Sequence, residues 1–112
     1  MGKARRRELR IGAQVWLWSV HHRHPPCQEV LSLRREGSPA VLRLVFAERG
    51  GRFASGGYAH SGLVGSADAA LNLHEPGVVR RFVDAADALG LPAAGRNETE
   101  IDGWPLFDTL TR

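Results

Sequence analysis

Apolar and polar residues between positions 75 and 90 alternate with the period of a helix. Apolar residues recur at steps of three and four along one side: Val78, Val79, Phe82, Val83, Ala86 and Leu89. The other side carries Arg80, Arg81, Asp84 and Asp87. Pro76 suits the first turn and Gly90 suits the position just beyond the last one. The pattern predicts an amphipathic helix over residues 75–90 with one face in a core.

The chain before this helix shows the two-residue alternation of β-strands. Residues 9–11 and 14–20 flank Gly12-Ala13, which predicts a β-hairpin. Residues 29–35 and 41–48 predict a second antiparallel hairpin, because a Gly-Ser-Pro turn separates them. Pro25-Pro26 interrupts the chain between the two hairpins.

The remaining segments are less regular. Residues 50–66 are dense in glycine and serine, which predicts a long loop holding at most one irregular edge strand. Residues 70–73 read as extended, and the apolar tail over 99–110 must pack as a strand, a short helix or both. In that tail Glu98, Glu100 and Asp102 alternate, which predicts a solvated edge strand.

These elements predict an α+β protein, with an antiparallel sheet of four to five strands and one principal helix packed on one face. At 112 residues the chain is long enough for one core. We expect a flexible basic arm over residues 1–8 and a single domain over residues 9–112. No segment has the roughly 18 consecutive apolar residues of a membrane span, so no membrane partner is expected.

Large apolar residues outnumber what one helix can cover. Trp16 and Trp18 share a face of one predicted strand, and Trp104 lies in the apolar tail. An apolar surface left uncovered marks an interface. The leading hypothesis is therefore a binding protein that contacts another protein through Trp16, Trp18 and Trp104 or through an exposed edge strand. The partner can also be a second copy of the chain, in a homodimer.

Charge supports a second hypothesis. Residues 1–56 hold eleven lysines and arginines against four acids, whereas residues 57–112 hold four against eight. A basic region can bind nucleic acid through its phosphates. The residues that would do so are Arg5, Arg6, Arg7, Arg10, Arg34 and Arg35. Trp16 or Trp18 could add a sheet face on which bases stack. In a single domain the two halves can instead neutralise each other.

A third hypothesis is metal binding by residues 21–27. His22 and His24 would lie on one side of an extended strand, and Cys27 could return through the prolines to add a thiolate. Paired spacings such as C-x-x-C are absent, so a solvated strand end is the simpler interpretation.

Catalytic signatures are missing. The chain has no G-x-S-x-G nucleophile elbow, no P-loop and no dinucleotide fingerprint, so we expect no cofactor. The sequence favours a non-enzymatic protein without deciding the point. Cys27 is the only cysteine, which is typical of the reducing cytoplasm.

Two segments carry a resemblance. Residues 71–82 (LNLHEPGVVRRF) and 101–107 (IDGWPLF), together with the hairpin order before them, resemble small uncharacterised single-domain proteins of GC-rich bacteria. The resemblance implies a bacterial cytoplasmic protein, and it implies no activity and no functional residue.

Overall fold

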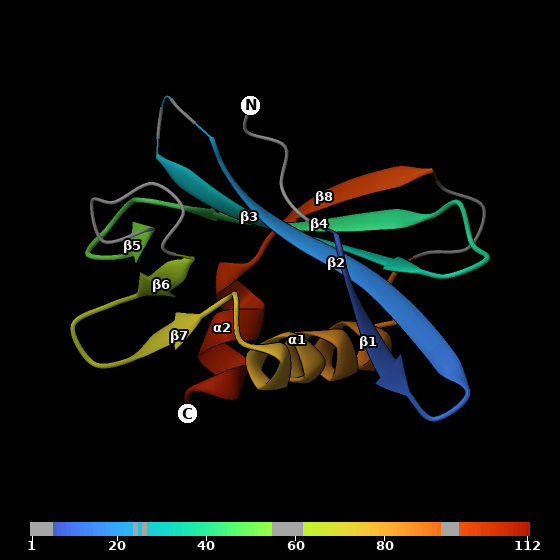
Figure 1. The fold of residues 1–112 in the computed structure, drawn as a ribbon. Helices are drawn as coiled ribbons and strands as arrows, with labels where there is room; N and C mark the ends of the chain where they lie inside the picture. Colours follow the sequence, from blue (N-terminus) through green and yellow to red (C-terminus); the bar gives the residue numbers. More distant parts are fainter. Residues whose placement is uncertain (1–5, 24, 26, 55–61, 93–96) are drawn as a thin grey trace.

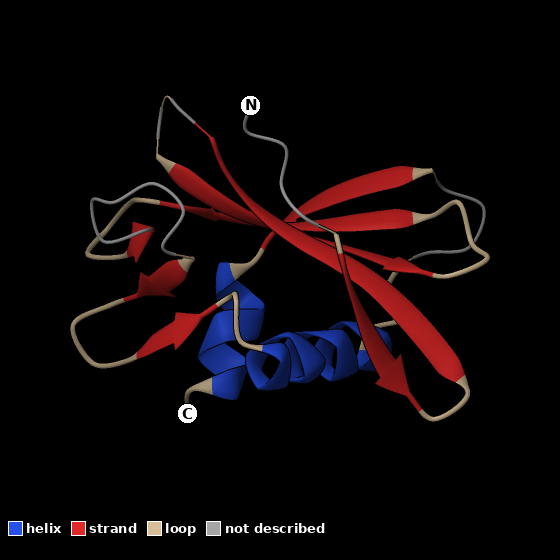
Figure 2. Cartoon of the chain, viewed as in Figure 1, coloured by secondary structure: helices blue, strands red, loops and turns tan. Residues whose placement is uncertain are grey.

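The computed structural model describes residues 6–23, 25, 27–54, 62–92 and 97–112. Its elements in chain order are β1 (Arg7–Ile11), β2 (Gln14–Arg23), β3 (Gln28–Arg35), β4 (Val41–Ala47), β5 (Phe53–Ala54), β6 (Leu63–Gly65), β7 (Ala70–Asn72), α1 (Pro76–Ala88), β8 (Glu98–Asp102) and α2 (Trp104–Leu110). Figure 2 shows the strands and the two helices of the described chain. The predicted α+β class is confirmed.

The main sheet has five strands in the order β1-β2-β3-β4-β8. Both predicted hairpins are present, because β1 pairs with β2 and β3 pairs with β4 in antiparallel fashion. The first strand begins at Arg7, two residues before the predicted start. β8 adds at the edge and runs parallel to β4, so the sheet is mixed rather than wholly antiparallel.

The described ends of the glycine-rich segment contain two strands. β5 and β6 form a three-stranded antiparallel sheet with β7, so the long-loop prediction for residues 50–66 is wrong at both of its ends. A tight turn at residues 49–52 starts this segment, with Gly50 and Gly51 at φ 52° and 82°. Positive φ at two consecutive central residues is the geometry of a type I′ turn, which glycine adopts without steric cost.

α1 confirms the predicted amphipathic helix with slightly narrower bounds. Its buried residues are Val78, Val79, Phe82, Val83 and Ala86. Pro76 begins the helix, and Gly90 has the left-handed φ of 74° expected just beyond its end. Leu89 was predicted on the buried face but is 64% exposed. The helix ends at Ala88, so Leu89 no longer follows the helical spacing that buries the residues before it.

Both helices lie on the same side of the main sheet, with the small sheet beside α2 (Figure 1). The core between these layers takes the alternate residues of β2, β3 and β4, including Trp16, Trp18 and Phe46. The Phe46 ring meets Phe82 and Trp104 edge to face, with ring centroids 5.5 Å and 5.2 Å apart. Trp104 on α2 therefore closes the core that α1 covers only in part.

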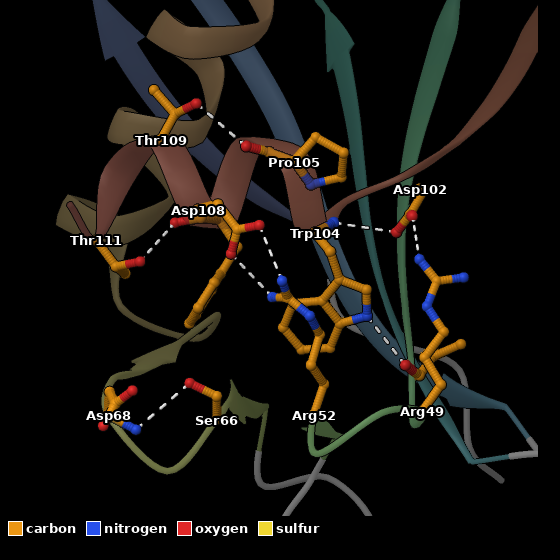
Figure 3. A network of polar contacts seen from close by, with 12 residues as sticks. Arg49, Arg52, Ser66, Asp68, Asp102, Trp104, Pro105, Asp108, Thr109 and Thr111 are labelled. Atoms are coloured by element: carbon orange, nitrogen blue, oxygen red, sulfur yellow. Dashed lines mark hydrogen bonds and ion pairs between the residues drawn. The ribbon is translucent and has the colours of Figure 1, made fainter.

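Polar contacts fix the start of α2 to the main sheet (Figure 3). Trp104 Nε1 donates a hydrogen bond of 2.9 Å to the Ala47 carbonyl oxygen. Arg52 donates through both terminal nitrogens to the Asp108 carboxylate, at 2.9 Å and 2.8 Å, and its guanidinium lies 4.8 Å from the centre of the Trp104 ring. We call Arg52, Trp104 and Asp108 the α2 anchor.

No helix in the described part of the chain is long and apolar enough to cross a membrane.

Candidate functional site

The face of the main sheet that points away from both helices, here the helix-free face, has a distinct charge pattern. Register and alternation place Arg23, Arg34 and Arg43 on this face of the three central strands β2, β3 and β4, together with His21. The described residues of these three strands contribute no carboxylate to this face. Cations therefore dominate its middle.

Acids on this face belong to the two edge strands, with Glu8 on β1 and Glu98, Glu100 and Asp102 on β8. Arg43 pairs with Glu98, and Arg23 pairs with Glu100 at 2.7 Å. The carboxylates are well exposed, at 65% for Glu98 and 48% for Glu100. Exposed pairs of this kind contribute little to stability, so a stronger anion can compete for their arginines.

A depression of about 220 Å³ opens in the middle of this face. Its chemistry comes from Arg6, Ser19, His21, Ser32, Arg34 and Arg43. The register explains why it exists: Ser19 and Ser32 are direct cross-strand partners, and Ser32 is also the partner of Arg43 on β4. Ser19 and Ser32 have short side chains, whereas the arginines in the lining have long ones, so the surface is lower at the two serines. The result is a hollow with hydroxyl donors and guanidinium groups, and none of its lining residues is acidic.

The electrostatics of His21 reflect this setting. Burial lowers the pKa of His21 below its ordinary value of 6.5, and the guanidinium groups of Arg23 and Arg43 lower it further. The carboxylates of Glu29 and Glu100 act in the opposite direction and do not outweigh them. At Glu100, the hydrogen bond from Arg23 lowers the pKa of the carboxyl group. An anion in the depression would thus meet a positive local field.

The described arginines that were predicted to bind nucleic acid lie on two different faces of the main sheet. Arg6 lines the depression, Arg34 lines it as well, and Arg10 lies on the same face by alternation. Arg7 and Arg35 point to the other face, with their guanidinium groups 4.8 Å from the Trp18 ring centre and 5.6 Å from that of Trp16. Arg5 lies outside the described residues.

The three tryptophans predicted to bind a protein are part of the core. Trp16, Trp18 and Trp104 are each 2% exposed, because their strand face and helix face meet between the layers. A partner cannot touch these rings in this conformation. Nothing tests whether the chain binds another protein, so that hypothesis stays a prediction and its contact surface must lie elsewhere.

The residues of the metal hypothesis are only partly described. His22 points to the core side of the sheet, where its Nδ1 bonds to the Glu29 carboxylate, and both side chains are almost fully buried. Cys27 is half-buried, and His24 lies outside the described residues. Within the described ranges, no group of three or more metal-ligating side chains forms. Metal binding by residues 21–27 stays a prediction.

Sequence reasoning missed the floor of the depression. Ser19, Ser32 and His21 were not among the predicted site residues, although the two-residue alternation already placed Ser19 and His21 on the face opposite Trp18. The missing information was the register, which alone shows that Ser19 and Ser32 are neighbours and that Arg43 lies beside them.

The chain matches no known protein family, and comparisons with curated proteins and with solved structures give no significant match. The resemblance to small bacterial proteins is therefore without support from a family, and the function must be argued from the site.

Proposed function

We propose that this protein binds nucleic acid through the phosphate backbone, on the helix-free face of the main sheet. The observation that carries the proposal is the depression in the middle of this face. Arg6, Arg34 and Arg43 line it together with Ser19 and Ser32, and no acid lines it. Guanidinium groups and hydroxyls are the groups that most often contact phosphate oxygens in protein complexes with nucleic acid.

The surroundings favour a polymer over a single small anion. Arg10 on β1 lies on the same face as Arg6, with Glu8 between them, and Arg23 lies on the same face of β2 as His21, so further arginines lie beyond the depression in two directions. Acids on β1 and β8 flank this basic middle. An extended polyanion that lies over the central strands meets arginines and avoids the carboxylates at the edges.

The same face lacks the side chains that read bases. The aromatic side chains of β2 and β4 alternate toward the helices, and Trp18, which contributes to the lining of the depression, is only 2% exposed. Binding would then depend on phosphates and not on base stacking, with little preference among sequences. A bacterial cytoplasmic location agrees with this function and stays part of the proposal.

Fluorescence anisotropy of a labelled single-stranded oligonucleotide of mixed sequence tests the proposal. Three phosphate contacts give a slope of about −2 when log affinity is plotted against log salt concentration, since single strands show about 0.7 per contact. Arg34→Gln is expected to weaken binding and to flatten this slope. Arg34 carries no carboxylate partner in the described part of the chain, and it bonds only to the Ser38 carbonyl oxygen at 3.2 Å.

Arg80→Gln is the matched control, because it removes the same charge from α1, where Arg80 pairs with Asp84. It should leave the affinity unchanged. Absence of binding at low salt would overturn the proposal. Equal weakening by Arg34→Gln and Arg80→Gln would overturn it too, since that result would mean attraction to net charge without a site. Binding of the oligonucleotide to the opposite side of the molecule, where the helices lie, would also overturn the proposal.

A further inference from the structure

Resting on the proposed nucleic-acid binding, we infer that the depression on the helix-free face is a subsite for a terminal phosphate monoester at the end of a nucleic-acid strand. The proposal names one occupant for the hollow at Ser19 and Ser32. It concerns the phosphate group that ends a chain, as opposed to the diester groups within it.

Size and donors fit a tetrahedral oxyanion. A depression of about 220 Å³ has room for one phosphate group together with water. Its lining includes Ser19 and Ser32, whose hydroxyls can donate hydrogen bonds, and three arginines, whose guanidinium groups have five N–H donors each. Arg34 uses one terminal nitrogen for Ser38 and keeps its other donors.

Charge favours the monoester over the diester. A phosphate monoester carries a charge of about −1.5 to −2 at pH 7, whereas each diester group in a strand carries −1. Three arginines line the depression, and among the described residues the only carboxylate bound to one of them is the exposed Glu98 on Arg43. The higher charge of the monoester gains more from these cations.

The row of residues across the sheet also favours a chain end. Ser19, Ser32 and Arg43 lie side by side on β2, β3 and β4, and the next residue in the row is Glu100 on β8. A strand laid along this row and continuing past Arg43 would place its next phosphate against the Glu100 carboxylate. A terminal phosphate has no neighbour on that side, so it escapes this repulsion.

The test compares labelled oligonucleotides of one sequence that end in a 5′-phosphate, a 3′-phosphate or hydroxyls at both ends. At least one phosphorylated form should bind roughly tenfold more tightly than the hydroxyl form, the usual effect of added charge-assisted hydrogen bonds. Inorganic phosphate should compete with the phosphorylated form at lower concentration than with the hydroxyl form, at equal ionic strength.

Two variants at Ser32 change the space and the hydroxyl in the depression and keep its positive charge. Ser32→Val fills the hollow and removes a hydroxyl without removing a cation, so it should weaken binding of the phosphorylated form more than binding of the hydroxyl form and abolish the preference between them. Ser32→Ala removes only the hydroxyl and should keep part of the preference. Thr109→Val is the control, because it removes a hydroxyl on α2 that bonds to the Pro105 carbonyl oxygen, far from the helix-free face. Circular dichroism checks that each variant folds.

The outcomes distinguish this inference from the proposed function. Equal binding of all three oligonucleotides, with Arg34→Gln still weakening each, would overturn the terminal subsite and leave the proposed function standing. Failure of all three to bind would overturn nucleic-acid binding and, with it, this inference, even if inorganic phosphate shifted the backbone amide resonances of Ser19 and Ser32 in NMR spectra. A preference that survives Ser32→Val would place the phosphate elsewhere and overturn the inference.

Discussion

The α2 anchor and the depression on the helix-free face both depend on arginine, but they use it in opposite ways. In the anchor, Arg52 gives both terminal nitrogens to Asp108 and lies over the Trp104 ring, so its charge and its surface are both occupied within the fold. In the depression, Arg6, Arg34 and Arg43 surround two serines with no acid in the lining. The first arrangement holds the layers together, and the second leaves donors for a ligand.

This contrast makes a simple prediction for mutagenesis. Changes in the anchor should lower the free energy of unfolding and spare oligonucleotide binding. Changes in the depression should do the reverse. Each experiment below is chosen to break or sharpen that separation.

The largest effect is expected for Trp104→Ala. The ring is 2% exposed, meets Phe46 and Phe107 edge to face, and donates to the Ala47 carbonyl oxygen. Deleting a buried aromatic side chain costs about 3–5 kcal/mol. Urea denaturation measures the loss. Trp104→Phe keeps a ring but removes the hydrogen bond, so its loss should be smaller; a loss below about 1 kcal/mol for Trp104→Ala would contradict the role given to the anchor.

Next comes Gly103→Ala, just before α2. A Cβ atom at this position would lie 2.5 Å from the Phe46 ring, and the ring is fully buried. Overpacking of a core costs about 1–3 kcal/mol, so the denaturation midpoint should fall. Gly77→Ala is the matched control, because its Cβ meets nothing within 4 Å on α1. A midpoint unchanged in Gly103→Ala would show that the core near Phe46 is loosely packed.

The third prediction pairs Arg34→Gln with Arg52→Gln. Arg34→Gln should weaken oligonucleotide binding roughly tenfold, because a hydrogen bond to a charged group is lost, and should change stability by less than about 0.5 kcal/mol. Arg52→Gln should lower the thermal midpoint and leave the affinity unchanged. Anisotropy and thermal denaturation on the same samples measure both. If each variant affected both properties alike, the separation between the two regions would be lost.

The smallest effect concerns pH and Asp108→Asn. The hydrogen bond from Arg52 lowers the pKa of Asp108 below its ordinary value of 3.8. The folded state therefore favours the carboxylate, and the stability gained is present above pH 3.8 and lost as the pH falls through the folded-state pKa. Wild type should exceed Asp108→Asn in stability at neutral pH, and the two should converge in acid. A difference that persists unchanged at low pH would mean that the carboxylate charge is not its source.

Local sequence patterns predicted the elements that are held by contacts between residues close together in the sequence. The helix over residues 76–88 and the two hairpins follow from periodicity and from the residues between them, and the structure confirms all three. Leu89 shows the limit of periodicity, because the end of the helix moved it out of the buried stripe.

Segments that depend on distant partners were harder to predict. β5 and β6 are two and three residues long, and they are held by pairing with each other and with β7. Nothing local in a glycine-rich stretch indicates such pairing. The parallel addition of β8 to β4 joins segments more than fifty residues apart in the chain. Sequence alternation alone could not choose it over an antiparallel edge.

The candidate site shows the same limit. Arg6, Arg10 and Arg34 were expected to contact phosphates, and alternation correctly separates them from Arg7 and Arg35 once the core face is known. The hollow itself needed the cross-strand pairing of Ser19 with Ser32. Conversely, the tryptophans were assigned to an interface because the sequence did not decide whether the apolar tail packs over that side of the sheet, where α2 and the small sheet lie beside α1.

The most direct test of the separation between anchor and depression is an NMR titration of the isotope-labelled protein with the single-stranded oligonucleotide. We expect amide shifts at Ser19, His21, Ser32 and Arg43, with the resonances of Arg52, Trp104 and Asp108 unmoved. Shifts that gather at the α2 anchor or along α1, with the central strands of the helix-free face unchanged, would contradict the account.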